Sequence, residues 1–356
     1  YHARMGIVIS ASHNPHADNG IKFFSESGEK LDEKEEMAIE QAMSQSKINT
    51  QPDQLGRQHH CDDAGGRYIE FCKSSVPPFF SLKGFKIAID CANGATCPIA
   101  PAVFTELKAE VLTVGTQPNG LNINDKVGST SPEQLQNLVT AQNCHFGIAL
   151  DGDGDRVILV DHDGNIVDGD KILYILAKDL YQSKDHQNRG VVGTQMSNMG
   201  LEIALNKERI PFFRTLVGDR HVMNQLRKSQ WLIGGESSGH IIWLQSTTTG
   251  DGIVAALQVA HIMQKTGLRL QELLKDLDTY PQTLINIELQ QSLSAAQLNK
   301  FQSLAKLAEE KLASKGRILL RPSGTEPLLR VMVEAHNQSL AQSTCQALAQ
   351  QIKALL

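Results

Sequence analysis

Aromatic residues are scarce in this chain and make up only 5% of it. Stacking platforms for nucleic-acid bases need aromatic side chains, so their scarcity argues against that class of binding. A long basic run is also missing, and the formal net charge is −5 at pH 7. The chain therefore lacks the electrostatic footprint of a nucleic-acid-binding protein, and we expect no nucleic-acid partner.

Long apolar runs are missing as well. None approaches the ~18 residues that a membrane-spanning helix needs, so we expect no membrane partner. The six cysteines, at positions 61, 72, 91, 97, 144 and 345, form no C-x-x-C pair and no cluster. They are typical of reduced thiols in a cytoplasmic protein rather than of a disulfide framework.

The length and the order of elements predict several α/β domains. A chain of 356 residues exceeds one ordinary core. Strands at 86–90 and 110–114 flank a glycine-containing turn and a helix, which is the βαβ pattern of a parallel sheet. Residues 284–356 follow a different order, β-α-β-β-α, which is typical of a small α+β domain.

The stretch from Gly6 to Pro15 combines an apolar strand with a polar turn. Its β-branched residues favour a buried strand, and Asn14-Pro15 ends it. Ser12 then lies at the end of a rigid strand and is a candidate covalent nucleophile, with His13 or a nearby lysine handling its proton. Lys22, on a strand at 21–24, is that lysine. An ordinary turn for Ser12 and a solvated edge lysine for Lys22 are the alternatives.

Asp151, Asp153 and Asp155 alternate with glycines after the apolar strand at 146–150. Three carboxylates at this spacing repel one another unless a cation lies among them, and oxygen-only ligation favours Mg²⁺. Solvated turn aspartates are the alternative. An EF-hand is excluded, because its sixth position would be Arg156 rather than glycine. Arg156 would lie beside the metal and could bind a phosphate.

Two further loops carry polar side chains. The loop at 234–240 holds Glu236, Ser238 and His240 and can contact a polyhydroxylated ligand, but taken by itself it is read first as a solvated turn. The segment at 321–330 offers the groups of an oxyanion or phosphate cradle, with a surface turn as the alternative. Its candidate residues are Arg321, Ser323, Gly324, Thr325 and Arg330.

The sequence resembles the α-D-phosphohexomutase superfamily, because four signature motifs occur in the superfamily's order. These motifs are Ile9–Pro15, Asp151–Arg156, Gly235–His240 and Arg321–Pro327. Within the superfamily, further segments resemble those of the phosphoglucosamine mutases more than those of phosphomannomutases. These segments are Gln117–Asn124, Met196–Gly200, Val217–Arg220 and Thr247–Gly252.

The resemblance implies three mixed α/β domains, the first one truncated, and a C-terminal α+β domain around a central cleft. The expected boundaries are 1–80, 81–187, 188–283 and 284–356. It also implies conversion of glucosamine 6-phosphate to glucosamine 1-phosphate through a 1,6-bisphosphate that also serves as activator, a step toward UDP-N-acetylglucosamine. The partner is a small phosphosugar, and a homodimer stays open.

The resemblance also assigns roles to residues. Ser12 would carry the phosphoryl group and, with the three aspartates, bind one Mg²⁺ per subunit. The catalytic set is Ser12, His13, Lys22 and Arg156; the sugar-binding set is Glu236, Ser238, His240 and Arg220; and the residues of the 321–330 loop would bind the non-reacting phosphate.

One departure from the superfamily concerns the start of the chain. Family members carry a segment before the serine loop, so we expect an upstream segment to be missing here.

Two alternatives stay open for the function. The chain could be a phosphomannomutase/phosphoglucomutase, or an inactive fragment that still binds sugar phosphates.

Overall fold

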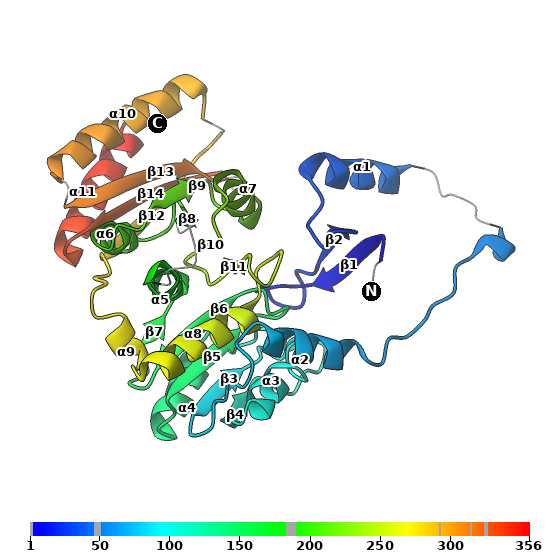
Figure 1. Cartoon of the computed structure of the whole chain (residues 1–356). Coiled ribbons are helices and arrows are strands. Elements are labelled where there is room, and N and C mark those ends of the chain that lie inside the picture. The colour runs from blue at the N-terminus through cyan, green and yellow to red at the C-terminus, as the bar shows by residue number, and fades with distance from the viewer. Residues whose placement is uncertain (1–2, 46–50, 183–189, 292, 314, 324–326) are drawn as a thin grey trace.

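The fold comes from a computed structural model that describes residues 3–45, 51–182, 190–291, 293–313, 315–323 and 327–356. Within these residues the strands form sheets of two, five, four and three strands, and each sheet is built from one continuous part of the chain. Figure 1 shows the four parts in chain order, from the blue N-terminal hairpin to the orange and red C-terminal domain. None of the described helices is long and apolar enough to cross a membrane.

The N-terminal part is an antiparallel hairpin of β1 (Met5–Ser10) and β2 (Gly20–Ser25), followed by α1 (Glu33–Ser44). Asp32 caps α1 in a capping box with Glu35, so the helix begins at the next residue, Glu33. The expectation that β1 is buried is wrong. Ile7 and Ile9 are 59% and 71% exposed, because the hairpin has two strands only and no described layer covers this face. Figure 1 shows it standing apart from the central sheets.

The five-stranded sheet has the order β4-β3-β5-β6-β7. Strands β3 (Lys86–Asp90), β4 (Glu110–Val114) and β5 (Phe146–Leu150) are parallel, while β6 (Val157–Asp161) and β7 (Ile166–Val167) turn back as a hairpin. Both β5 and β6 are buried along their whole length, because helices cover both faces of the sheet. Their near-continuous apolar sequences reflect this burial.

Short helices surround this sheet. They are η1 (Pro52–Gln54), α2 (Ala64–Ser74), α3 (Ala100–Glu106) and α4 (Glu133–Ala141). A serine directly before a proline and a helical stretch predicts Ser131 as the cap of α4. This prediction is wrong: Pro132 occupies the capping position, and no side chain there bonds the helix. The Ser131 N–H instead closes a turn on the Gly128 carbonyl, at 3.0 Å.

The next unit has a four-stranded sheet of order β11-β10-β8-β9. Its strands are β8 (Val191–Thr194), β9 (Phe212–Thr215), β10 (Ile233–Gly235) and β11 (Ile241–Trp243). Its helices are α5 (Gly169–Gln182), α6 (Met199–Lys207), α7 (Asp219–Ser229), α8 (Gly252–Thr266) and α9 (Leu270–Leu273). Helix α8 also contacts β5 and β6, so one apolar core runs through both central units and fixes their relative position.

The C-terminal unit follows the expected β-α-β-β-α order. Strands β12 (Gln282–Glu288), β14 (Leu328–Ala335) and β13 (Gly316–Pro322) form an antiparallel sheet in that spatial order. Helices α10 (Ala295–Lys311) and α11 (Gln338–Lys353) pack on the sheet and on each other. The unit has an apolar core of its own, centred on Phe301, and is therefore a separate domain.

Candidate active site

Ser12 lies directly against the loop that carries the three aspartates. Its hydroxyl donates to Asp151 Oδ2 at 3.2 Å, and its carbonyl accepts from the Gly152 N–H at 3.0 Å and from Asn124 Nδ2 at 2.8 Å. The Ser12 backbone has a positive φ of 53°, which non-glycine residues rarely adopt and which often marks functional positions. The serine is therefore held by its backbone, while its hydroxyl faces the carboxylates.

Glycines allow this close approach of three segments. A Cβ on Gly152 would lie 2.5 Å from the Ser12 carbonyl oxygen, and a Cβ on Gly94 would lie 2.2 Å from the Gly152 carbonyl oxygen. Both contacts are with backbone atoms, which cannot move aside as a flexible side chain would. The serine loop, the aspartate loop and the turn after β3 thus stack backbone on backbone.

The three aspartates converge. One carboxylate oxygen from each of Asp151, Asp153 and Asp155 lies within 4.8 Å of the others. Asp151 is fully buried, and its burial together with the charges of Asp155 and Asp153 raises its pKa to about 7. Asp153 Oδ1 and Asp155 Oδ1 are buried without a hydrogen-bond partner. Unpaired buried oxygens around a shared centre fit a hard divalent cation, which prefers oxygen ligands.

Lys22 bridges two of these carboxylates from β2. Its Nζ lies 2.5 Å from Asp153 Oδ2 and 2.9 Å from Asp155 Oδ2. Burial acts to lower the pKa of Lys22, but attraction to Asp155 and Asp153 outweighs it, so the pKa is raised and Lys22 stays a cation. The solvated edge lysine is thereby excluded.

Two other predicted catalytic residues complete the cluster around Ser12. Burial, with a contribution from Arg156, lowers the pKa of His13, which favours its neutral form; its Nδ1 is buried and accepts no described hydrogen bond. The Arg156 N–H donates to Asp151 Oδ1 at 3.1 Å. The predicted catalytic residues are thus brought together by the hairpin and the loop after β5.

The loop between β10 and β11 lies against the aspartate loop. The Gly239 carbonyl accepts from the Val157 N–H at 3.0 Å, and Arg156 and His240 form an isolated β-bridge. His240 is only 4% exposed, its Nε2 lies 3.9 Å from Asp155 Oδ2 and 3.8 Å from Asp219 Oδ2, and burial lowers its pKa. The predicted sugar-binding loop is therefore adjacent to the predicted metal site.

The remaining sugar-binding residues have different surroundings. Glu236 Oε1 accepts from the Gly218 N–H at 2.8 Å, and Ser238 is exposed. The Arg220 guanidinium donates to the Leu31 carbonyl at 2.9 Å and to Glu36 Oε2 at 2.7 Å, so it joins α7 to the N-terminal unit.

A hollow of about 490 Å³ adjoins the carboxylates. Lys22, Lys30, Asp153 and Asp155 line it together with Tyr68 and the residues of the 246–251 loop. Ligand pockets for small molecules commonly have volumes of this size. The charged rim suits a ligand that carries both negative charge and hydroxyl groups.

The predicted phosphate cradle belongs to the C-terminal sheet. Arg321 on β13 lies directly opposite Arg330 on β14, and the Ser323 N–H closes the strand pair on Leu328 at 2.8 Å. Side chains of opposite residues in a strand pair share one face, so this register concentrates two positive charges on one patch. Gly324 and Thr325 lie outside the described residues. Figure 1 shows β13 and β14 in a different domain from β1 and β5, so this patch belongs to another body than the Ser12 cluster.

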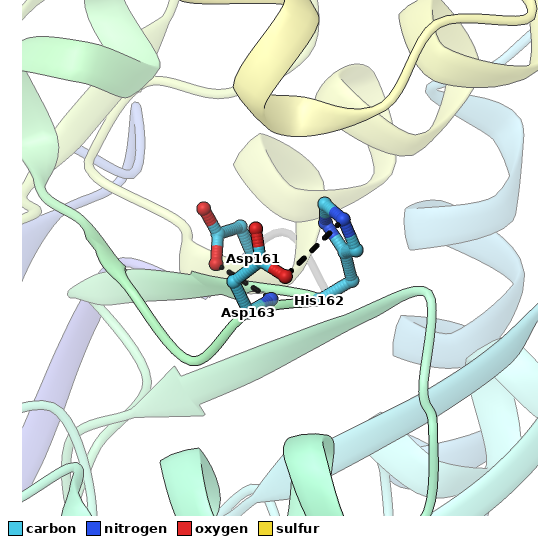
Figure 2. Close-up of side chains that lie close together, drawn as sticks. All are labelled: Asp161, His162 and Asp163. Carbon is cyan, nitrogen blue, oxygen red and sulfur yellow. Dashed lines mark hydrogen bonds and ion pairs between the residues drawn. The ribbon is translucent and has the colours of Figure 1, made fainter.

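A second group of potential metal ligands occurs among the residues that the structure describes, at the turn between β6 and β7. Figure 2 shows Asp161, His162 and Asp163 there. Asp161 Oδ1 accepts from the N–H groups of Asp163, at 3.0 Å, and Asn165, at 2.8 Å, while Asp163 is exposed. These bonds close the hairpin turn between β6 and β7, and we assign the group to turn formation.

Sequence reasoning missed two residues of the site. Asn124 holds the serine loop through its side chain, and Asp219 faces His240 and forms an ion pair with Lys30. Both lie in segments quoted above for the family resemblance. The residue type of Asn124 could have indicated a special backbone position, because Asn tolerates positive φ, and Asn124 has a φ of 57° here.

The chain matches four models of one family. The domain I model of phosphoglucomutase/phosphomannomutase matches residues 1–49, and the domain II model matches residues 67–164. The domain III model matches residues 168–280, and the C-terminal domain model matches residues 284–351.

Curated relatives and solved structures agree with this family. A phosphoglucosamine mutase of Glaesserella parasuis is 52% identical over 354 residues, covering 99% of this chain and 79% of the relative. A phosphoglucosamine mutase of Methylobacillus flagellatus is 51% identical over 347 residues, covering 98% and 76%.

Among solved structures, a phosphoglucomutase/phosphomannomutase family protein from Burkholderia thailandensis has a TM-score of 0.81 at 22% identity, covering 98% of this chain and 76% of that one. The N-acetylphosphoglucosamine mutase of Aspergillus fumigatus, in complex with GlcNAc-6P and magnesium, has a TM-score of 0.75 at 20% identity, covering 98% and 89%. At these identities the likeness concerns the fold.

Proposed function

Because the chain belongs to the phosphoglucomutase/phosphomannomutase family, we propose that it interconverts glucosamine 6-phosphate and glucosamine 1-phosphate. Relatives that share half of its residues are named phosphoglucosamine mutase, which supports this substrate pair over the hexose phosphates. The observation that carries the proposal is the Ser12 hydroxyl, 3.2 Å from a convergent carboxylate triad.

The proposed reaction is a phosphoryl transfer through a phosphoserine. The bond between phosphorus and Ser12 Oγ breaks as a sugar hydroxyl bonds the phosphorus, which gives the 1,6-bisphosphate. The bisphosphate then reorients in the site, and its other phosphoryl group is transferred to Ser12. Such transfers need positioning and charge neutralisation more than covalent assistance.

Asp151, Asp153 and Asp155 would hold Mg²⁺ together with Ser12, and the ion would neutralise charge on the transferring phosphoryl group. Lys22 and Arg156 add fixed positive charge beside it. His13, whose neutral form is favoured by burial, is the neighbour of Ser12 that can take up and return the proton of the sugar hydroxyl.

The other loops would hold the part of the substrate that does not react. In this proposal the sugar hydroxyls meet Glu236, Ser238, His240 and Arg220, and the remote phosphate meets Arg321, Ser323, Gly324, Thr325 and Arg330. The same remote phosphate-binding residues would hold the bisphosphate in both of its orientations, so either phosphate can face Ser12.

The proposal includes the wider setting. We place the domain boundaries at 1–80, 81–187, 188–283 and 284–356, and the reaction in the cytoplasm, which the unpaired cysteines support. The 1,6-bisphosphate would serve as intermediate and activator. A homodimer stays a prediction.

Turnover of glucosamine 6-phosphate tests the proposal. With Mg²⁺ and a trace of the 1,6-bisphosphate, we expect turnover that exceeds that of glucose and mannose 6-phosphates. Ser12→Ala removes the phosphoryl acceptor and should lower turnover by a factor of at least about 1,000. The control is Ser44→Ala, at an exposed position on α1. A preference for mannose or glucose phosphate would instead support a phosphomannomutase/phosphoglucomutase, and full activity of Ser12→Ala would refute the phosphoserine.

A further inference from the structure

Asn124, in the loop between β4 and α4, holds the serine loop at two points. Its side-chain NH₂ donates to the Ser12 carbonyl and to the Asn14 carbonyl, each at 2.8 Å. Carbonyl oxygens accept only from the NH₂ end of an amide, so these two partners fix the orientation of the side chain. Its Oδ1 is buried and accepts no described hydrogen bond. The two bonds from the NH₂ group form the Asn124 clamp.

The serine loop needs support from outside because its backbone is strained. The Asn14 N–H donates to the Ala11 carbonyl at 2.9 Å, which closes a four-residue turn with Ser12 as its second residue. A positive φ at this position of a turn is typical of glycine, whereas Ser12 has a φ of 53°. Such a conformation persists only where surrounding contacts hold it. The direction of the Ser12 hydroxyl therefore depends on those contacts.

The described contacts hold the polar backbone groups around the serine. The Ser12 N–H donates to Ser10 Oγ at 2.8 Å, and the Ser12 carbonyl accepts from the Gly152 N–H at 3.0 Å as well as from the clamp. The clamp also reaches the Asn14 carbonyl, beyond His13. It therefore holds the turn on both sides of His13, which the bond from Gly152 does not.

The loop that carries the clamp is itself fixed by a buried carboxylate. Asp90 ends β3 and is fully buried; its Oδ1 accepts from the Ala92 N–H at 2.9 Å, and its Oδ2 accepts from the Gly128 N–H at 2.7 Å. The Asn124 N–H donates to the Ala92 carbonyl at 2.9 Å. The loop is thus tied to the end of the five-stranded sheet at Asn124 and again at Gly128, and the clamp rests on a rigid base.

The residue type suits this position in two ways. Asn124 has a φ of 57°, and asparagine enters the left-handed region more readily than most residues with a side chain. Its amide also supplies the two donors that the carbonyls of the serine loop need, whereas an ionised aspartate of the same shape supplies none. Backbone conformation and donor number together favour asparagine here.

From this geometry we propose that Asn124 is a positioning residue of the reaction, whose clamp holds the strained serine loop so that the Ser12 hydroxyl faces the carboxylate triad. Asn124 is not among the described residues that line the 490 Å³ hollow, so it acts through Ser12 and not through the substrate. The kinetic part of the proposal rests on the function proposed above. The clamp as a support of the turn does not.

A misplaced serine should affect transfer more than binding. Phosphoryl transfer needs the attacking and leaving oxygens in line with the phosphorus, and a shift of about 1 Å can lower a rate by about 100-fold. The proposed sugar-binding and phosphate-binding residues belong to other loops, which the clamp does not contact. Loss of the clamp should therefore lower kcat and leave KM nearly unchanged.

Two variants remove the clamp in different ways. Asn124→Asp keeps the shape of the side chain and replaces both donors by a carboxylate. Asn124→Gly removes the side chain and allows the left-handed backbone at no steric cost. For both we expect kcat with glucosamine 6-phosphate to fall by about 10- to 100-fold, while KM changes by less than about twofold. Mg²⁺ affinity from titration calorimetry should match the parent, because the three carboxylates are kept.

Hydrogen exchange tests the clamp without any substrate. The backbone amides of Asn14 and Gly152 are bonded within the serine loop and to it, respectively, and both should exchange faster in the two variants. The matched control is Asn143→Gly, because Asn143 has a φ of 51° but is exposed after α4. This control should match the parent in kcat and in the exchange of both amides.

The outcomes separate the clamp from the proposed function. Parent-like kcat in Asn124→Asp, or unchanged exchange of both amides in the two variants, would overturn the proposal. So would a raised KM with unchanged kcat, because Asn124 would then act on substrate binding. A parent chain without turnover would refute the proposed function alone, since the exchange experiment still decides whether the clamp supports the turn.

Discussion

At the scale of single residues, Asp170 makes the stability of the fold depend on pH. Its carboxyl is 3% exposed at the start of α5, and Oδ2 accepts from the Asn198 N–H at 2.7 Å. Burial, and then the neighbouring charge of Asp168, raise its pKa to about 7. The ordinary value in an unfolded chain is about 3.9.

The sign of the effect follows from proton uptake. Between pH ~4 and ~7 the folded chain binds the Asp170 proton more strongly than the unfolded chain, so the free energy of unfolding falls as the pH rises through this window. Asp170→Asn keeps an acceptor for Asn198 and removes the titration. We therefore expect the variant to gain stability over the parent between pH 5 and pH 8, as measured by urea denaturation.

The quantity to compare is the difference in the free energy of unfolding between variant and parent at each pH, because the other buried acids contribute equally to the pH dependence of both proteins. Asp53→Asn, at an exposed position, is the matched control and should track the parent at every pH. If the difference between Asp170→Asn and the parent stayed constant with pH, Asp170 would not be the titrating group.

The sequence predicts residues of the site better than their contacts. Ser12 and the three aspartates are candidates from local signals, namely a strand end and glycine alternation, although an ordinary turn stayed open for Ser12 until the other motifs were considered. The partners of Arg220 could not be named, because Glu36 is 184 positions away and only the folded chain brings it near.

At the scale of elements, the turn after β3 tests how tightly the loops of the site are stacked. Gly94→Ala places a Cβ 2.2 Å from the Gly152 carbonyl oxygen, which is a backbone atom. We expect a loss of about 1–3 kcal/mol in the free energy of unfolding, as for other overpacked positions. Mg²⁺ affinity should fall with it, and chemical denaturation and calorimetry measure the two effects.

The control for this substitution is Gly66→Ala on α2. A Cβ there meets nothing within 4 Å, and alanine favours a helix by up to about 1 kcal/mol, so this variant should be as stable as the parent or more so. Unchanged Mg²⁺ affinity in Gly94→Ala would show that the turn does not support the aspartate loop.

Elements with two buried faces were the most predictable. Strands β3 and β5 begin and end where the sequence predicts, because both are covered and their apolar runs stop at polar turns. The β-branched run of β1 gives the same signal, yet the strand is exposed. Residue type reports the preference for a strand, whereas burial depends on what else packs there, which local sequence does not contain.

At the scale of the whole molecule, a buried ion pair within the C-terminal domain holds the arginine that binds the unit before it. Glu334 is fully buried, and Arg317 Nε lies 2.5 Å from its Oε2. The Arg317 guanidinium also donates to the carbonyls of Gln195, at 2.8 Å, and Ser197, at 2.7 Å. Arg317 shares β13 with Arg321, so this contact orients the strand that carries the predicted phosphate cradle.

Arg317→Met leaves the Glu334 carboxylate buried without its cation. Such a change lowers the free energy of unfolding by about 3–5 kcal/mol in comparable buried pairs. We expect a lower melting temperature and a KM for glucosamine 6-phosphate that rises more than kcat falls, because the domain that holds the remote phosphate is less well placed. Adding Glu334→Leu removes the unpaired charge and should restore part of the stability while KM stays raised; the rest is lost with the bond that Glu334 Oε2 accepts from the Met199 N–H at 3.0 Å.

Lys306→Met, exposed on α10 of the same domain, serves as the control and should behave as the parent. If Arg317→Met weakens the contact between the C-terminal domain and the unit before it, hydrogen exchange of the backbone amides at residues 194–199 should become faster. A fall in kcat with unchanged KM would contradict this role.

The strand–helix patterns predicted the class of the units, and the family resemblance implied their number. Neither predicted how they attach. The two central units share one apolar core through α8, whereas the C-terminal domain is joined by a polar contact. Attachments of this kind combine residues from distant segments, and no local pattern reports them.

The exposed N-terminal hairpin has one further consequence. Its apolar face is uncovered, and much of what ties this part to the central units is ionic. The pairs are Lys22 with Asp153 and Asp155, Lys30 with Asp219, Arg220 with Glu36, and Arg227 with Glu29. Dissolved ions screen such attractions over about 8 Å at physiological ionic strength, and more strongly in concentrated salt, whereas apolar cores are not weakened by it. We therefore expect added salt to loosen the contact between the N-terminal part, which carries Ser12, and the aspartate loop before it weakens the rest of the fold.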